Sequence, residues 1–238
     1  MAYMKDGPAS RASTRHVPRM FVHSRLADDV AVALSPEKAR HLTLVLRSAE
    51  GDPVHLFDDV TGEWRARIET LTKRQAILRV ERQLAPREPV PDIWLLAAPI
   101  KKARYGWIAE KAAELGAARL VPVLTERTGG VEAAQAKPER LFAHMIEAAE
   151  QCGRTALPTL GDAVKLETLL ADWGRTEDTG ARTLLFCDEE GGPDALQTMR
   201  AVPAPAAILI GPEGGFSRDE RQAIADVPLG QRLSLGAR

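Results

Sequence analysis

Short alternating patterns of apolar and polar residues dominate the chain from residue 19 to residue 85. Residues 54–57, 64–68 and 76–80 place apolar side chains at every second position, and turn-forming residues fill 58–62. This period of two is typical of strands that bury one face and expose the other. The pattern predicts a small all-β module over residues 19–85, and it favours a barrel.

Two segments without periodicity flank this module. Residues 1–18 mix glycine, proline, serine and charged residues, which indicates a flexible tail. Residues 86–91 contain three prolines, and each proline fixes φ and removes a backbone donor. We therefore expect an extended linker at 86–91, followed by a second domain over residues 92–238. The P-x-x-P spacing is also that of SH3 ligands, but an interdomain spacer is the favoured interpretation.

From residue 92 onward, apolar segments of strand length alternate with longer segments of helical spacing. The strand candidates are the apolar runs at residues 93–98, 119–124, 183–187, 206–210 and 232–235. Alternation of strands and helices predicts an α/β domain with a mostly parallel sheet covered by helices. Ligand sites in such domains lie outside the carboxyl ends of the strands, so the residues that follow each strand are the first candidates.

Three helices have recognisable ends. Apolar residues recur at helical spacing over residues 105–115, where Gly116 follows as a C-cap, and over residues 138–152, where Gly153 follows. A third helix begins with the capping-box pattern S-R-D-E at residues 217–220 and runs to about residue 226.

Composition and charge describe an ordinary globular chain. Its 238 residues are 45% hydrophobic and 27% charged, with 32 basic against 33 acidic side chains, which excludes a disordered or collagen-like protein. The longest apolar run, residues 93–100, is far shorter than the roughly 20 residues of a membrane helix, and the amino terminus lacks the apolar stretch of a signal peptide. A cytoplasmic protein without membrane contact is therefore predicted.

Neither a metal site nor a disulfide is expected. Cys152 and Cys187 form no C-x-x-C, and the five histidines form no H-E-x-x-H or zinc-finger spacing. Basic residues outnumber acidic ones in residues 1–90, and the reverse holds in the rest of the chain. This bias is compatible with nucleic-acid contact and equally with a solvated surface.

The sharpest local feature is the segment ILIGPEGGFS at residues 208–217, where an apolar strand enters a glycine-rich turn before the capped helix. Gly211, Gly214 and Gly215 allow positive φ and close approach of a ligand, and Pro212 stiffens the turn. No lysine follows as in a Walker A motif, and the chain contains no G-x-G-x-x-G, which disfavours P-loop and Rossmann sites. A ligand loop and a plain connecting turn both remain open.

Basic residues also follow predicted strands and helices at residues 101–104 (KKAR), 125–128 (TERT) and 150–154 (EQCGR). Arg154, just past a helix end, either offsets the helix dipole or offers a fork of donors to a phosphate or base edge. Lys101 and Lys102 either face solvent at the start of a helix or contact backbone phosphates.

Taken together, six segments resemble the ribosomal RNA small subunit methyltransferase E family, the uridine-N3 methyltransferases of the SPOUT superfamily. They stand in the family's order and approximate spacing at residues 41–47 (HLTLVLR), 56–58 (LFD), 110–116 (EKAAELG), 126–127 (ER), 150–154 (EQCGR) and 211–217 (GPEGGFS). Each segment alone is a weak signal, but six in register make coincidence very improbable. The resemblance covers residues 19–238.

This resemblance implies an amino-terminal PUA-like β-barrel and a carboxyl-terminal SPOUT-type α/β domain with a trefoil knot. It also implies S-adenosylmethionine as the methyl donor and a homodimer whose active site forms near the subunit interface. The implied substrate is a uridine of 16S ribosomal RNA, within the small ribosomal subunit.

One departure from the family concerns the carboxyl end. In the family, the stretch matching residues 235–238 continues into an Ile-Leu-Arg segment, a Glu-Thr-Ala segment and a last helix, which complete the knot and part of the cofactor pocket. The sequence here stops at Arg238. A protein that truly ends there is expected to bind the cofactor poorly.

The resemblance also suggests site residues. Backbone groups are expected to hold the cofactor at Ile210, Gly211, Pro212, Glu213, Gly214, Gly215, Leu235 and Gly236. Uracil N3 carries a proton at neutral pH, so donors must stabilise negative charge on the uracil oxygens and a base must take the proton. Arg154 is the predicted donor, with Arg127 and Arg238 in reserve, and Glu126 is the predicted base.

Contacts to the RNA backbone are predicted from basic residues of both domains, namely Arg19, Arg47, Arg65, Arg67, Lys101 and Lys102. Two other functions stay open. A non-catalytic RNA-binding or ribosome-assembly protein would use the β-module for RNA and the α/β domain for dimerisation. A nucleotide-binding enzyme of unrelated chemistry would instead bind nucleoside triphosphates.

Overall fold

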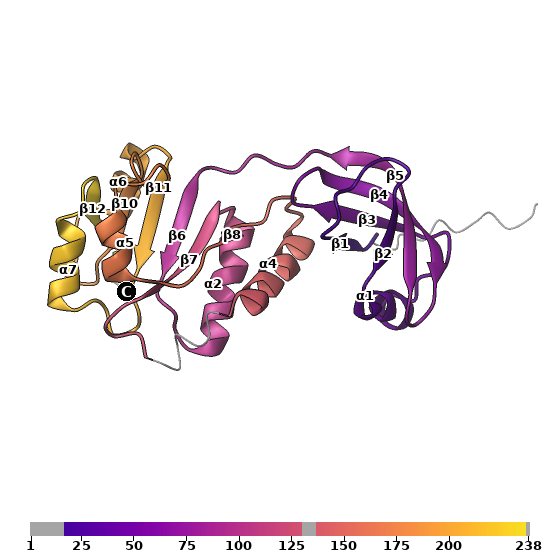
Figure 1. Cartoon of the computed structure of the whole chain (residues 1–238), viewed down its shortest axis with the longest axis horizontal. Coiled ribbons are helices and arrows are strands. Elements are labelled where there is room, and N and C mark those ends of the chain that lie inside the picture. The colour runs from indigo at the N-terminus through magenta and orange to yellow at the C-terminus, as the bar shows by residue number, and fades with distance from the viewer. Residues whose placement is uncertain (1–16, 130–136, 237–238) are drawn as a thin grey trace, which may run out of the picture.

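The computed structural model describes residues 17–129 and 137–236 and contains two sheets. Residues 19–85 form one sheet, and the second sheet begins at residue 93. Figure 1 shows the two sheets side by side along the long axis of the molecule, with the extended linker passing from one to the other. The tail predicted for residues 1–18 falls almost entirely outside the described residues.

The first sheet surrounds its own apolar core. Its strands are β1 (Arg19–Phe21), β2 (Ala31–Leu34), β3 (Pro53–Asp58), β4 (Gly62–Leu71) and β5 (Ala76–Ala85). They pair in the order β1-β3-β4-β5-β2, with β1 parallel to β3 and the other ladders antiparallel. The β-module predicted over residues 19–85 is confirmed, but it is not all-β, because residues 36–45 between β2 and β3 are helical.

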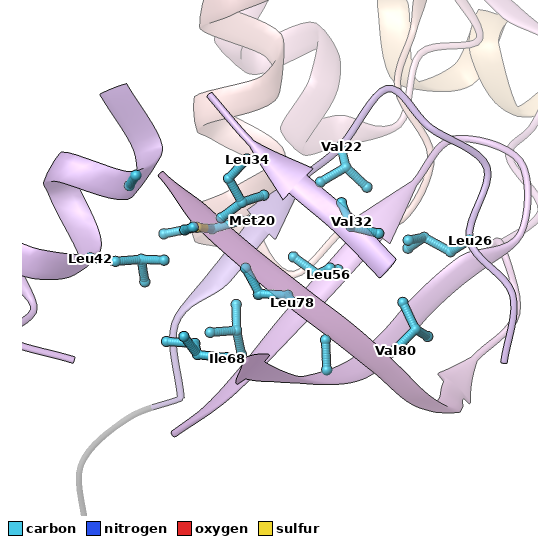
Figure 2. Packing of buried hydrophobic residues seen from close by; sticks show 14 residues of the cluster. Met20, Val22, Leu26, Val32, Leu34, Leu42, Leu56, Ile68, Leu78 and Val80 are labelled. Carbon is cyan, nitrogen blue, oxygen red and sulfur yellow. The ribbon is translucent and has the colours of Figure 1, made fainter. Parts of the chain in front are cut away.

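The period of two in the sequence turns one face of each strand toward this core. Leu56, Ile68 and Leu78 lie on three neighbouring strands and are almost completely buried within the cluster drawn in Figure 2. Burial of each such side chain contributes roughly 1.5–3 kcal/mol relative to exposure. The β4–β5 ladder contains register shifts at three places, and such irregularities bend a sheet so that it wraps around its core.

The connection between β2 and β3 contains α1 (Pro36–Arg40) and the π-helix η1 (His41–Val45). Ser35 caps α1, because its hydroxyl accepts a hydrogen bond from a backbone N–H of the first turn at 3.3 Å. Leu42 is fully buried in the module core, which fixes the π-helix to the sheet. The chain leaves this helical segment at Arg47, whose φ is +51°.

Asp58 ends β3 and organises the turn that follows. Its carboxylate accepts hydrogen bonds from the backbone N–H groups of Leu26 at 2.6 Å, of Val60 at 2.9 Å and of Thr61. Burial would by itself raise the pKa of Asp58, but the donated N–H groups outweigh it and lower the pKa below its ordinary value. Asp58 therefore joins two loops of the β-module.

The second sheet is entirely parallel. Its strands are β6 (Ile93–Ala97), β7 (Arg119–Leu124), β8 (Thr159–Leu160), β9 (Val164–Lys165), β10 (Thr183–Cys187), β11 (Ala206–Ile210) and β12 (Gly230–Leu233). The order is β12-β10-β11-β6-β7-β8, and β9 pairs with β7. The α/β class predicted from the alternation of strands and helices is confirmed.

Helices cover both faces of this sheet. They are α2 (Lys102–Leu115), α4 (Pro138–Cys152), α5 (Leu166–Asp172), α6 (Ala195–Ala201) and α7 (Arg218–Ala225). Tyr105 of α2 and Met145 of α4 are buried together on one face, and Leu166 of α5 and Ile224 of α7 are buried on the other. In the part of the chain that the structure describes, no helix is long and apolar enough to cross a membrane.

No sequence pattern indicated the short strands β1, β2, β8 and β9 or the short helices α1, η1, α5 and α6. These strands have two to four residues and these helices five to seven, which is too short to show a period. The last strand was predicted at residues 232–235 but pairs with β10 from Gly230 to Leu233. The next residue, Ser234, makes only an isolated bridge with Asp194, because the chain there turns toward the start of α6.

Candidate functional site

Two loops meet at the carboxyl edge of the parallel sheet. The glycine loop, defined here as residues 211–217, follows β11, and residues 125–129 follow β7. Arg127 donates a hydrogen bond of 2.5 Å from Nη1 to the carbonyl oxygen of Gly214. The Glu126 N–H donates to Oε1 of Glu220 at 2.7 Å. The structure thus brings Glu126 and Arg127, two of the predicted site residues, against the glycine loop.

One carboxylate fixes the end of the glycine loop. Oε2 of Glu220 accepts from the Ser217 N–H at 2.9 Å, and Ser217 Oγ accepts from the Glu220 N–H at 3.3 Å. This is the capping box predicted from the sequence, and it satisfies donors that the first turn of α7 would otherwise leave unpaired. The other oxygen of Glu220 binds the loop after β7, a second role that the local pattern does not reveal.

The three glycines of the loop are needed for different reasons. A Cβ at Gly211 would lie 2.6 Å from the Phe216 ring, so packing within the loop excludes a side chain there. Gly215 has φ of +69°, and a Cβ at this position would lie 1.8 Å from Oε1 of Glu189. A Cβ at Gly214 would meet only Arg127, at an ordinary contact distance of 3.5 Å. The chain's own packing therefore requires glycine at 211 and 215, but not at 214.

A charged cluster lies at the end of the neighbouring strand β10. Asp188 has a side chain only 3% exposed and pairs with Nη1 of Arg221 at 2.9 Å and with Nε of Arg232 at 2.6 Å. Arg221 also pairs with Glu189 and, at 2.8 Å, with Glu190. This cluster was not predicted from the sequence, although three consecutive acidic residues directly follow the predicted strand at 183–187.

Open space and exposed apolar surface adjoin the glycine loop. A cleft of about 670 Å³ is lined by residues of the two loops, β10, α7 and β12, among them Arg127, Phe186, Asp188, Phe216, Arg218, Arg221 and Arg232. Ile210 is 37% exposed at the end of β11, and Leu235 is 69% exposed after β12. Gly236 follows with φ of +92°. These predicted cofactor contacts therefore present apolar and backbone surface at the same edge of the sheet.

Arg154 lies at a different edge of the parallel sheet. Its Nε donates at 2.8 Å to the carbonyl oxygen of Glu114 at the end of α2, and its Nη1 pairs with Oε2 of Glu88 at 3.0 Å. Both partners precede a strand of the parallel sheet, so Arg154 is at the amino-terminal edge, opposite the glycine loop. Within one chain the structure does not bring Arg154 together with Glu126 and Arg127.

The predicted RNA contacts are also spread out. Arg19 is largely buried, with its side chain 9% exposed and its Nε 3.1 Å from Glu63. Arg65 and Arg67 share one partner, because both pair with Glu81, at 3.0 and 2.6 Å. Arg47 is exposed at the end of the π-helix segment.

The remaining predicted residues lie in the second domain. Lys101 is the exposed N-cap residue of α2, and Lys102 begins that helix, both after the carboxyl end of β6. Arg238 lies outside the described residues. Among the described residues, no group of histidine, cysteine and acidic side chains has the arrangement of a metal site.

Comparison with protein families matches both parts of the chain. Residues 86–238 match the family described as "RNA methyltransferase domain", and residues 34–81 match "RNA methyltransferase PUA domain". Two curated relatives are named Ribosomal RNA small subunit methyltransferase E. The one from Rickettsia conorii is 26% identical over 92% of this chain and 87% of its own length. The one from Synechocystis is 29% identical over 92% of this chain and 71% of its own length.

Two solved structures share this architecture. A putative methyltransferase from Legionella pneumophila, in complex with bound SAM, is 30% identical and superposes with a TM-score of 0.78 over 94% of this chain and 90% of its own. A Ribosomal RNA small subunit methyltransferase E from Neisseria gonorrhoeae, bound to S-adenosyl methionine, is 26% identical with the same TM-score and the same coverage of both chains.

Proposed function

Since the chain belongs to the RNA methyltransferase family, among its ribosomal RNA small subunit methyltransferases E, we propose that it methylates N3 of a uridine in 16S ribosomal RNA. Its reaction class is methyl transfer from S-adenosylmethionine to ribosomal RNA. The observation that carries the proposed site is the glycine loop at the carboxyl edge, held by Arg127 and Glu220. We place the cofactor at this loop.

The residues present fit such a cofactor. Ile210 and Leu235 offer exposed apolar surface for a purine ring, and the backbone of residues 211–215 and of Gly236 lies beside them. Gly214 keeps the loop open without being required by the chain's own packing, which is expected where a ligand approaches the backbone. When bound, S-adenosylmethionine supplies a methyl group carried on a positively charged sulfur.

The chain's own contribution is to position the uracil and to remove its N3 proton. The carboxylate of Glu126 is exposed beside the loop and is the proposed proton acceptor. Arg127 holds Gly214 with one N–H and lines the cleft. Its remaining N–H groups are the proposed donors to the uracil oxygens where negative charge develops. Arg154 has no part in this proposed site, because its guanidinium is held by Glu88 and Glu114 at the opposite edge of the sheet.

We also propose that the protein works as a homodimer, with the site near the subunit interface, on RNA within the small ribosomal subunit. This assembly is the one that the resemblance to the family implies. Light scattering at micromolar concentration tests the dimer, and a monomeric mass would contradict it. Methylation of assembled small subunits and of free 16S RNA, run in parallel, tests the form of the substrate.

The deciding experiment is methylation of 16S RNA from cells that lack this protein, followed by mapping of the product. Methylation at N3 removes the Watson–Crick donor of uracil, so reverse transcriptase should stop at one uridine. A methyl group on a ribose hydroxyl or on another base would overturn the N3 assignment. A non-catalytic assembly protein would bind the RNA and transfer no methyl group, and it would show no affinity for S-adenosylhomocysteine.

A further inference from the structure

The carboxyl-terminal end of α4 forms a joint that connects the β-module to the methyltransferase domain. Arg19 of β1 donates from Nη1 to the carbonyl oxygen of Ala149 at 2.6 Å and from Nη2 to the carbonyl oxygen of Arg154 at 2.5 Å. Its guanidinium also lies 3.8 Å above the centre of the Phe57 ring. A cation from one domain thus caps the carbonyl end of a helix in the other, where the helix dipole favours positive charge.

Glu150, an acidic residue of α4, connects the same two domains. Its Oε1 accepts from the Phe21 N–H at 2.9 Å and from Nζ of Lys38 at 3.1 Å. Lys38 also donates to the carbonyl oxygen of Phe21 at 2.6 Å. The carboxylate and the ammonium group therefore hold the end of β1 between them, and both are partly shielded, with side chains 21% and 30% exposed.

Arg154 ties the linker to this joint. Its Nη1 pairs with Oε2 of Glu88 in the linker, and its Nε holds the last turn of α2 through Glu114. Glu88 makes two further bonds with Thr155, at 2.9 and 3.0 Å, in which each residue's N–H donates to the other's side chain. Gly116 leaves room for the guanidinium, since a Cβ there would lie 2.6 Å from Nη2 of Arg154.

From these contacts we propose that Glu150 and Arg154 are positioning residues that hold the β-module in one orientation relative to the glycine loop. Domains joined by a linker ordinarily move relative to each other unless their interface prevents it. Figure 1 shows the β-module at one end of the long axis of the molecule and β11, which leads into the glycine loop, toward the other. A rotation at the joint therefore shifts any RNA held by the module relative to the glycine loop. The inference rests on the proposed RNA methylation, because it assigns the joint a role in presenting RNA.

The orientation can be measured independently of catalysis. Spin labels on Lys73→Cys, in the exposed turn after β4, and on Arg200→Cys, on exposed α6, report the distance between the domains in a Cys152→Ser, Cys187→Ala background. We expect Arg154→Ala to broaden the distance distribution and Arg154→Lys to restore part of its sharpness. Glu150→Gln keeps an acceptor for the Phe21 N–H and is the milder second variant. Arg79→Ala removes a 2.8 Å ion pair within the module, and as the matched control it should leave the distribution sharp.

Kinetics on the same variants complete the test. For Arg154→Ala we expect unchanged affinity for S-adenosylmethionine, a KM for RNA raised about tenfold, and a kcat at saturating RNA within about threefold of wild type. A sharp distribution with kcat reduced about a hundredfold would overturn the proposal and would support a direct catalytic role instead. Unchanged distances and kinetics would also overturn it. A failure of the proposed function shows itself separately, as absence of N3 methylation by the wild-type protein, while the distance measurement still decides whether the joint is rigid.

Discussion

The guanidinium of Arg127 and the carbonyl oxygen of Gly214, 2.5 Å apart, connect the loop after β7 to the glycine loop after β11. The two residues are 87 positions apart in the chain and belong to strands separated in the sheet by β6. This bond holds the carbonyl of Gly214 in one direction, and with it the peptide plane on which the proposed cofactor rests.

Replacement of Arg127 by Met should weaken binding of S-adenosylmethionine about fivefold to tenfold, because a charge-assisted hydrogen bond at a partly exposed position contributes on the order of 1 kcal/mol. Titration calorimetry measures the affinity. Arg175→Met, at an exposed arginine before β10, is the control and should bind normally. If Arg127→Met bound as tightly as wild type, the bond to Gly214 would have no part in holding the cofactor.

Substitutions at the loop glycines should distinguish an effect on cofactor binding from an effect on folding stability. The free energy of unfolding of Gly214→Ala should stay within about 1 kcal/mol of the wild-type value, because the added Cβ makes only an ordinary contact with Arg127. The same variant should bind S-adenosylmethionine at least tenfold more weakly. Gly215→Ala should lower the melting temperature, because it forces a Cβ into a positive-φ residue and against Glu189. Adding Glu189→Ala should recover part of the stability lost in Gly215→Ala.

Thermal melting and calorimetry on these variants decide the assignment. Equal affinity of Gly214→Ala and wild type would remove the loop from the cofactor site. A Gly215→Ala protein as stable as wild type would contradict the packing argument at that position, whatever its affinity.

Asp58 should make the β-module sensitive to acid. Its pKa is lowered in the folded protein, so its contribution to stability is fully present above the ordinary pKa of about 3.9 and is lost as the pH falls through the folded-state value. Asp58→Asn places an amide among three N–H donors, and we expect a loss of about 1–3 kcal/mol in the free energy of unfolding at pH 7.

Urea unfolding of wild type and Asp58→Asn between pH 3 and pH 7 measures the difference. The difference in the free energy of unfolding should shrink below about pH 4, because protonated Asp58 lacks the negatively charged carboxylate that asparagine also lacks. A difference that stays constant over this range would mean that ionisation of Asp58 does not contribute to folding.

The two cysteines should differ in reactivity. Burial raises the pKa of Cys187 to about 11, whereas Cys152 is exposed at the end of α4. Because the thiolate is the reactive form, iodoacetamide at pH 8 should alkylate Cys152 first and leave Cys187 nearly unmodified. Mass spectrometry of the native protein should show one modified cysteine, and the unfolded protein should show two. Rapid modification of Cys187 in the native protein would contradict its partial burial at the end of β10.

The sequence by itself determined the features that depend on neighbouring residues. The helix over 138–152 and the capping box at 217–220 were predictable because period and caps are local, and the glycine loop was recognisable for the same reason. The succession of strands and helices then indicated a parallel sheet, and a parallel sheet brings the loops after its strands to one edge. That edge is where Glu126 and Arg127 meet the glycine loop.

Only the tertiary structure decided which charged residues form hydrogen bonds and ion pairs within the chain. Arg19 and Arg154 were both predicted from charge and resemblance, yet Arg19 binds the carbonyl of Arg154 across 135 positions of sequence, and both serve the joint between the domains. Likewise, Arg65 and Arg67 share Glu81 across a ladder. A pattern of residue types shows that a charge exists, but its partner is chosen by packing between segments far apart in the chain, and no local period records that choice.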